Sequence, residues 1–288
     1  YMNIVIANTN GNEQYLSEGE FLEVTAQTLE EPVLNSRIAV AYDRKTGNVI
    51  WGKNEFKKSA MASTTKIMTA LLAIENCDLN EVIEVSSKAA GIGGSRLGLK
   101  KDDKINMQDL LYGLMLPSGN DCAVAIAEHL SGDVESFMDA MNQEARRLGA
   151  TNTHFVNPHG LHDENHYTTA RDMAKIVCYA IQNPAFFEIY STIYYDFPAT
   201  NLSESREFTS NNYLMSSMDN RRLYNDSRVT GGRTGTTEDG KRSLAISAAD
   251  NGRTLISIIM GSANTYNEED QSIITFGGFP ETSDLLTM

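Results

Sequence analysis

Four consecutive residues, Ser63-Thr64-Thr65-Lys66, combine a nucleophile and a base at a spacing that suits catalysis. A serine and a lysine three positions apart on a helix lie on the same face, with their polar ends within reach of each other. A serine hydroxyl becomes a strong nucleophile when a base takes its proton, and lysine serves as that base when burial and a nearby cation favour its neutral form. Taken alone the tetrad is weakly specific, because a chain of this composition contains about one Ser-x-x-Lys by chance.

A second group, Ser118-Gly119-Asn120, follows Pro117 and precedes a helical pattern. It places a hydroxyl and an amide on a turn bounded by proline and glycine, directly ahead of the new helix. The structural alternative is that Ser118 or Asn120 only caps that helix. A rival Ser-x-Asn occurs at residues 210–212, so context distinguishes the first from the second.

A third group, Arg233-Thr234-Gly235-Thr236, lies in the strand-like run VTGGRTGTT, which we expect at the edge of a sheet. Gly235 would let a substrate backbone approach closely, the two threonines offer hydroxyls, and the cation of Arg233 suits a carboxylate. The alternative is a surface strand with one charged residue. A literal Lys-Thr-Gly occurs at residues 45–47, where two strand-like runs flank it and predict a hairpin turn without a catalytic role.

Periodicity predicts the elements that must position these groups. Strand-like runs lie near both ends of the chain and helical patterns lie between them. The strands are expected at residues 38–43, 48–54, 229–237, 242–250 and 254–262, and the helices at residues 63–75, 106–116, 121–130, 134–148 and 169–182. This order predicts an α+β fold with an antiparallel sheet of about five strands, covered on one face by the helix that contains Ser63, and with an inserted all-helical lobe.

The expected domain organisation follows from the same pattern. Residues 1–35 are expected to be an irregular lead-in, residues 36–275 the catalytic domain, and residues 276–288 a tail. Within the domain, a sheet lobe comprises about 36–86 and 208–275, and a helical lobe about 87–207. No apolar run is long enough to cross a membrane. Because the chain begins with Tyr1, we expect that an export signal or anchor has been removed.

Composition excludes some functions. The formal net charge of −14 over 288 residues argues against a nucleic-acid surface, which needs clustered lysine and arginine. Three cysteines, Cys77, Cys122 and Cys178, lie in apolar helical settings without close pairs, so we expect buried free thiols and no disulfide framework.

Four of the five histidines fall between His154 and His166, and the run from His162 to His166 is similar to a His-Glu-x-x-His zinc helix. Asn157, Pro158 and Gly160 predict a loop there instead, which lacks the helical geometry that such a zinc site requires. We therefore expect loop-packing histidines, no metal and no cofactor.

In this order, the three groups resemble the Ser-x-x-Lys, Ser-x-Asn and Lys-Thr-Gly set of the penicillin-binding proteins and serine β-lactamases. Longer segments are similar to the low-molecular-mass D-alanyl-D-alanine carboxypeptidases, over about residues 36 to 265. These segments are ASTTKIMTALLAIE, GGSRLGLKKDD, LLYGLMLPSGNDCAVAIAEHLSG, TNTHFVNPHGLHDENHYTTARDMAKI and GGRTGTTEDGKRSLAISA.

The resemblance implies a serine-type D-Ala-D-Ala carboxypeptidase that acts on peptidoglycan stem peptides and is acylated by β-lactams. Ser63 would be the nucleophile, Lys66 its general base and Ser118 a proton relay, while Asn120 would bind the peptide chain of the substrate. Thr234 with Arg233 would hold the terminal carboxylate. The backbone N–H groups of Ser63 and Thr236 would form the oxyanion hole, with Gly235 between the two threonines. The resemblance also implies an extracytoplasmic location, with membrane contact only through segments absent from this chain.

Arg233 departs from the family pattern, in which a lysine stands at this position. Arginine keeps the charge and binds carboxylates in a fork, but it cannot shuttle a proton. We therefore expect a working enzyme with altered substrate preference or rate. Two alternatives are a β-lactamase, for which Glu164 is the candidate activator of water, and a catalytically dead wall-binding or β-lactam-sensing module, which only Arg233 supports.

Overall fold

The structure, a computed structural model, describes residues 6–7, 13–14, 32–216, 224–267 and 273–287. The chain divides into two compact units, residues 1–31 and 32–288. In the first unit, β1 (Ile6–Ala7) pairs antiparallel with β2 (Glu13–Gln14). The expected lead-in at residues 1–35 lies mostly outside the described residues.

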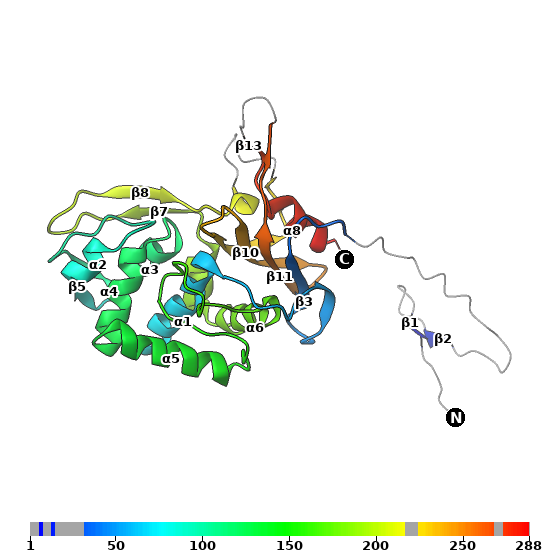
Figure 1. Ribbon diagram of the computed structural model, residues 1–288, viewed down its shortest axis with the longest axis horizontal. Helices are drawn as coiled ribbons and strands as arrows, with labels where there is room; N and C mark the ends of the chain where they lie inside the picture. The colour runs from blue at the N-terminus through cyan, green and yellow to red at the C-terminus, as the bar shows by residue number, and fades with distance from the viewer. Residues whose placement is uncertain (1–5, 8–12, 15–31, 217–223, 268–272, 288) are drawn as a thin grey trace. The chain divides into compact units, whose positions relative to one another are not determined.

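The second unit is built on a five-stranded antiparallel sheet, as the sequence predicts. The strand order is β4-β3-β11-β10-β9, so strands from both ends of the sequence lie side by side (Figure 1). The bounds are β3 (Ile38–Asp43), β4 (Val49–Lys53), β9 (Val229–Thr236), β10 (Arg242–Asp250) and β11 (Arg253–Ser262). The strand β9, which carries Arg233, is an edge strand as expected.

Both faces of the sheet are buried, which explains why its strands are apolar along most of their length. In β3, Ile38 and Val40 pack into the main core, whereas Ala39 and Ala41 pack into a second cluster with Phe279. This alternation follows from the two-residue period of a strand.

The remaining elements lie mostly between the two halves of the sheet in the sequence. The helices are η1 (Ala62–Thr65, a 3-10 helix), α1 (Lys66–Asn76), α2 (Ser87–Gly91), α3 (Met107–Met115), α4 (Asn120–Ser131), α5 (Val134–Arg147), α6 (Ala170–Ala180), α7 (Pro184–Ser191), η2 (Tyr213–Met215, also 3-10) and α8 (Phe279–Leu285). Three small two-stranded antiparallel sheets pair β5 (Val82–Glu84) with β6 (Lys104–Asn106), β7 (Tyr194–Phe197) with β8 (Arg206–Thr209), and β12 (Thr265–Tyr266) with β13 (Ile273–Thr275).

Local signals account for several helix starts. The side chains of Asn106, Asp133 and Thr169 each accept a hydrogen bond from a backbone N–H in the first turn of the helix that follows. Pro184 is the first residue of α7, where its missing N–H costs no intrahelical hydrogen bond. The segment expected as a tail contains α8, whose Phe279 is fully buried.

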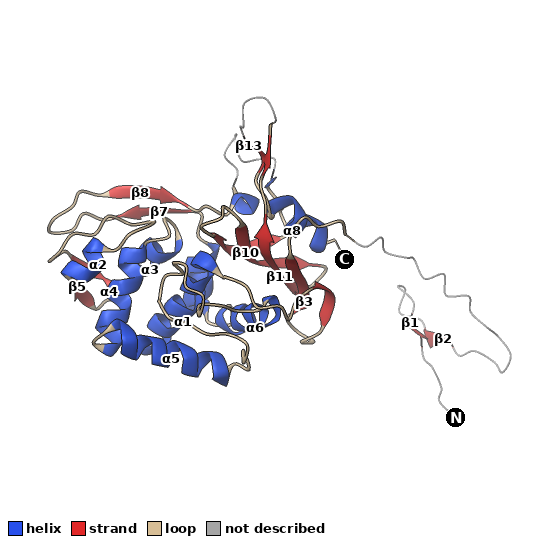
Figure 2. Cartoon of the chain, viewed as in Figure 1, coloured by secondary structure: helices blue, strands red, loops and turns tan. Residues whose placement is uncertain are grey.

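The helix that covers the sheet is not the one that the sequence indicated. We expected the helix containing Ser63 to lie on the sheet, but α6 packs against β3, β10 and β11. The helix α1 lies instead among α3 to α7, and the preceding turn η1 contacts β9 and β10. Figure 2 shows the helices gathered beside the sheet, with α8 on the opposite face. Periodicity shows that α1 is buried, but it does not show which element buries it.

Two smaller predictions have clear outcomes. Residues 45–47 form the turn between β3 and β4, where the Gly47 N–H donates to the Asp43 carbonyl, so the literal Lys-Thr-Gly is a hairpin turn. All three cysteines are free, but only Cys122 is buried, so the expected burial of Cys77 and Cys178 was wrong. None of the helices in the described residues is long and apolar enough to cross a membrane.

Candidate active site

A chain of hydrogen bonds joins the three groups that the sequence singles out. The Arg233 guanidinium donates to Ser118 Oγ, which lies 3.0 Å from Ser63 Oγ. Ser63 Oγ in turn lies 3.1 Å from Lys66 Nζ. Ser63 is half-buried, so this hydroxyl remains accessible from solvent. Residues from a helix start, an inter-helix turn and an edge strand thus meet at one oxygen.

The polarity of this chain favours loss of the Ser63 proton. A guanidinium is only a donor, so the Ser118 hydroxyl accepts from Arg233 and directs its own hydrogen toward Ser63 Oγ. Because Ser63 Oγ accepts the hydrogen of Ser118, its own hydrogen can point to Lys66 Nζ when that amine is neutral. Each donor in the series therefore stabilises negative charge on Ser63 Oγ.

Lys66 is held in a position where it can act as a base. Its Nζ contacts the Asn120 Oδ1 atom at 2.8 Å and the His159 carbonyl oxygen at 2.6 Å, in addition to Ser63. Both carbonyl oxygens can only accept, so Lys66 Nζ donates one hydrogen to each of them. The third substituent position of this nitrogen, a hydrogen or a lone pair, faces Ser63 Oγ. Complete burial, followed by the charge of Arg233, holds the pKa of Lys66 well below its usual range. In its neutral form, the amine points its lone pair at Ser63 Oγ.

The turn before α4 places Ser118 and Asn120 by backbone contacts. The N–H of Gly119 donates to the Gly113 carbonyl, and that of Asn120 donates to the Ser95 carbonyl. Ser118 has a φ of 67°, a left-handed conformation that is unfavourable for a residue with a side chain.

The Asn120 amide is oriented from both ends. Its Nδ2 donates to the Gly93 carbonyl at 2.8 Å while Oδ1 accepts from Lys66. An amide nitrogen has two hydrogens, so one remains for a substrate carbonyl.

The edge strand β9 brings a buried cation to the site. Arg233 is only 2% exposed, and burial lowers its pKa to about 10, which still leaves it charged at neutral pH. Its Nε has no hydrogen-bond partner among the described residues. Thr234 is buried and Thr236 is exposed. Within the described residues, neither threonine side chain joins the series of hydrogen bonds from Arg233 through Ser118 to Ser63.

Two glycines are required by close approach to the turn η1. A Cβ on Gly235 would lie 2.8 Å from the Ser63 backbone nitrogen, so this glycine lets the strand itself, and not only a substrate, approach the nucleophile. Gly160 has a φ of +96°, and a Cβ there would lie 1.9 Å from the Ala62 carbonyl oxygen. The N–H of Ser63, in the first turn of η1, has no acceptor within the helix.

Two histidines, whose roles the sequence does not indicate, support the site through contacts with Thr65 and Lys66. The His166 Nδ1 accepts from the Val156 N–H at 3.1 Å, so its Nε2 carries the hydrogen and donates to Thr65 Oγ1 at 2.8 Å. Thr65 Oγ1 donates to the Ala62 carbonyl, so His166 braces the turn that holds the nucleophile. His159 offers its backbone carbonyl to Lys66, which no side-chain pattern could reveal.

Both histidines are neutral at neutral pH. Burial, followed by the charge of Lys66, lowers the pKa of His159 to about 3. Burial is also the main reason why the pKa of His166 falls to about 4.

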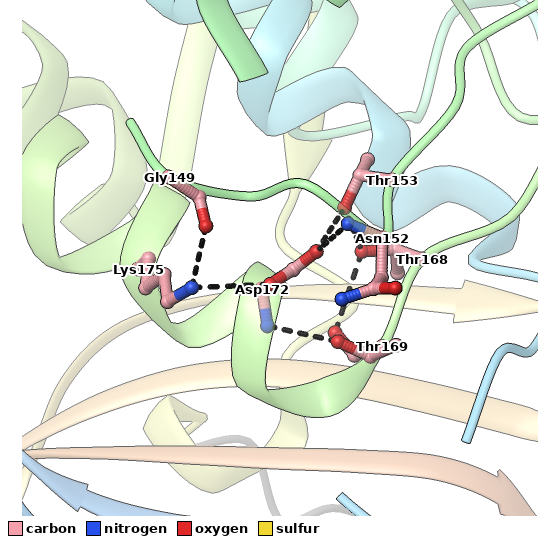
Figure 3. Close-up of polar contacts among 7 residues, drawn as sticks. All are labelled: Gly149, Asn152, Thr153, Thr168, Thr169, Asp172 and Lys175. Carbon is pink, nitrogen blue, oxygen red and sulfur yellow. Dashed lines mark hydrogen bonds and ion pairs between the residues drawn. The ribbon is translucent and has the colours of Figure 1, made fainter. Parts of the chain in front are cut away.

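A second polar network anchors the loop that carries these histidines (Figure 3). Asp172, in the first turn of α6, accepts from the Asn152 N–H at 2.7 Å and the Thr153 hydroxyl at 3.2 Å. Its carboxylate also pairs with Lys175, whose Nζ donates to the Gly149 carbonyl. The loop is thus held to α6, the helix that packs against β3, β10 and β11.

The alternatives from the sequence find no support in this geometry. Residues 162–166 form a turn and not a helix, and both ring nitrogens of His166 are engaged, so a zinc helix there is wrong. Glu164 is exposed and takes no part in the hydrogen-bond chain around Ser63.

Comparisons with known proteins agree with these features. The family profile described as D-alanyl-D-alanine carboxypeptidase (peptidase S11) matches residues 25–264. The D-alanyl-D-alanine carboxypeptidase DacF of Bacillus subtilis (strain 168) is 32% identical over 258 residues, which are 88% of this chain and 64% of DacF. The chain therefore spans less than two thirds of that relative.

Solved structures cover nearly the same region. The D-alanyl-D-alanine carboxypeptidase of Mycobacterium tuberculosis H37Rv superposes with a TM-score of 0.77 at 27% identity, over 91% of this chain and 93% of that one. The Streptomyces K15 DD-transpeptidase superposes with a TM-score of 0.74 at 27% identity, over 89% and 95%.

Proposed function

Because this chain belongs to the D-alanyl-D-alanine carboxypeptidase family, we propose that it is a serine-type carboxypeptidase that removes the terminal D-alanine of peptidoglycan stem peptides. The observation that carries this proposal is the hydrogen-bond chain from Arg233 through Ser118 to Ser63, with a buried Lys66 on the other side. It supplies a nucleophile, a base and a cation in one accessible place.

Acylation begins when Lys66 takes the Ser63 proton and Ser63 Oγ forms a bond to the carbonyl carbon of the penultimate D-alanine. The backbone N–H groups of Ser63 and Thr236 stabilise the oxyanion. The C–N bond to the terminal D-alanine then breaks, and the proton held by Lys66 reaches the departing amine through Ser118. Arg233 keeps its own protons, so it steers this transfer without taking part in it.

Substrate orientation follows from positions along β9. Arg233 and Thr234 hold the terminal carboxylate, and Thr236 lies two residues farther along the strand at the scissile carbonyl. The stem peptide therefore continues past Thr236, with its backbone held by Asn120. A pocket of about 350 Å³ lies there, lined by Arg37, Ser59, Ala60, His162, Thr237, Glu238, Asp239, Lys241 and Gly261.

Deacylation and location complete the proposal. Water releases the acyl chain from Ser63, while a β-lactam, which resembles the terminal dipeptide, leaves a long-lived acyl-enzyme. The enzyme works outside the cytoplasmic membrane, where stem peptides are found. The sheet lobe contributes Ser63 and Arg233, and the helical lobe contributes Ser118 and Asn120, so the domain at 36–275 acts as two lobes around one site.

The test is intact-protein mass after brief incubation with benzylpenicillin, followed by D-alanine release from a peptide ending in D-Ala-D-Ala. The native chain should gain one penicillin mass and release D-alanine, and Ser63→Ala should do neither. Ser210→Ala, in the rival Ser-x-Asn, is the matched control and should behave as the native chain. Adduct formation without any D-alanine release would support the sensing module, and rapid loss of free drug without an adduct would support a β-lactamase.

A further inference from the structure

Three side chains with metal-ligating atoms meet at the ends of α1 and α4 that lie away from the active site. Cys77 is the residue that directly follows α1, His129 lies in the last turn of α4, and Glu81 precedes β5. Their ligand atoms all lie within 4.8 Å of one another. Within the part of the chain that the structure describes, this is the only such group of histidine, cysteine and acidic side chains.

The distances in this group suit a small tetrahedral cation. The Cys77 Sγ lies 3.3 Å from one Glu81 carboxylate oxygen, and the His129 Nε2 lies 3.2 Å from the other. Zinc binds sulfur, nitrogen and oxygen at about 2.0 to 2.3 Å, which places neighbouring ligand atoms roughly 3.3 to 3.7 Å apart. We propose that Cys77, Glu81 and His129 bind a zinc ion, with water as the fourth ligand.

The backbone around the ligands is fixed, so little reorganisation is needed. The Cys77 N–H donates to the Ala73 carbonyl at the end of α1. Glu81 is held in a turn by the Asp78 carbonyl, and its own carbonyl accepts from the Met107 N–H. His129 is part of the regular helix α4. Side-chain exposures of 25% for His129 and 49% for Glu81 leave room for solvent.

The charges of the group are complementary to a divalent cation. Zinc displaces the proton of the Cys77 thiol to solvent and binds the thiolate. Thiolate and carboxylate together neutralise the two positive charges, and imidazole with thiolate favours zinc over calcium or magnesium.

The consequence of zinc binding is mechanical. The helices α1 and α4 begin at Lys66 and Asn120, whose side chains are hydrogen-bonded at the active site. A metal between Cys77 and His129 ties together the opposite ends of the same two helices. Zinc would therefore fix α1 relative to α4, and so the position of Lys66 relative to Asn120, from a site several helical turns away.

The experiment uses the purified, chelator-treated chain with a phosphine reductant, and cobalt(II) as a spectroscopic substitute for zinc. We expect one metal ion per chain, and a cobalt complex with a thiolate-to-metal charge-transfer band that zinc abolishes by competition. Cys77→Ser should lose the band, and Cys77→Ser and His129→Ala should each bind zinc at least tenfold more weakly. Cys178→Ser, also half-buried, is the matched control and should keep both.

A second measurement needs no variant. Zinc should protect one thiol of the native chain from alkylation, and peptide mass should identify it as Cys77. Zinc should also raise the melting temperature of the native chain but not that of Cys77→Ser. Unchanged zinc affinity in Cys77→Ser, or a cobalt complex without a thiolate band, would overturn the proposal. Loss of binding in a His154→Ala/His162→Ala double variant, with Cys77→Ser unaffected, would do the same and assign the metal to the histidine loop.

Discussion

Replacing Arg233 by glutamine should move the pH dependence of acylation, because Arg233 is the nearest cation that lowers the pKa of Lys66. Three hydrogen bonds in series separate the two charges, which places them at most about 9 Å apart. At an effective dielectric constant of about 20, this separation corresponds to about 2 kcal/mol. Loss of the charge should therefore raise the pKa of Lys66.

The sign follows from the role of Lys66 as a base. The neutral amine is the active form, so acylation is lost as pH falls through the pKa of Lys66 in the free enzyme. In Arg233→Gln this acid limb should therefore lie at a higher pH than in the native chain. The plateau rate should also fall by roughly tenfold to a hundredfold, since the carboxylate loses a charged hydrogen bond of about 1.5 to 3 kcal/mol.

The assay is the second-order rate of acylation by benzylpenicillin as a function of pH, with D-alanine release from a peptide as a second readout. Arg233→Lys is the matched control because it keeps the charge, so its acid limb should stay close to that of the native chain. An acid limb at the same pH in Arg233→Gln would refute the electrostatic argument. Equal peptide turnover by Arg233→Lys and the native chain would show that arginine at this position is incidental.

Further predictions concern packing, pH and backbone strain. In a urea titration, Gly235→Ala should lower the free energy of unfolding by about 1 to 3 kcal/mol, because the new Cβ would lie 2.8 Å from the Ser63 backbone nitrogen. Gly91→Ala is the control: no atom lies within 4 Å of its new Cβ, so its free energy of unfolding should be unchanged or higher. As pH falls from about 6.5 to about 4, the unfolded chain gains a proton at residue 166 that the buried imidazole does not take up, so His166 alone should lower the free energy of unfolding by roughly 3 kcal/mol, and buried His159 should lower it further. His166→Gln should make this pH dependence less steep without removing it, and exposed His162→Gln should leave it unchanged; equal slopes for His166→Gln and the native chain would contradict the assignment. Ser118→Gly should abolish turnover yet be up to about 1 kcal/mol more stable than Ser118→Ala, because glycine accepts the positive φ, and a less stable glycine variant would argue against strain there.

Most elements, and the order of the candidate catalytic groups, can be predicted from local residue patterns alone. Alternating and helical periodicities depend on neighbours within one or two turns, so β3, β10 and the central helices were found nearly to the residue. Turn chemistry is equally local, and Asn251 and Gly252 both have the positive φ of a tight hairpin between β10 and β11. The three candidate catalytic groups are recognisable because each keeps its residue types within four positions.

Which side chains come together, and how each is hydrogen-bonded there, depends on the packing of distant parts of the chain. The contact of Lys66 with the His159 carbonyl, and that of Thr65 with His166, each join residues more than 90 positions apart through atoms whose partners residue type does not specify. The same holds for the burial of Arg233 against Ser118, which fixes the polarity of the hydrogen-bond chain. Local sequence encodes propensity and periodicity, whereas a pKa or a hydrogen-bond direction depends on everything that excludes water from the group.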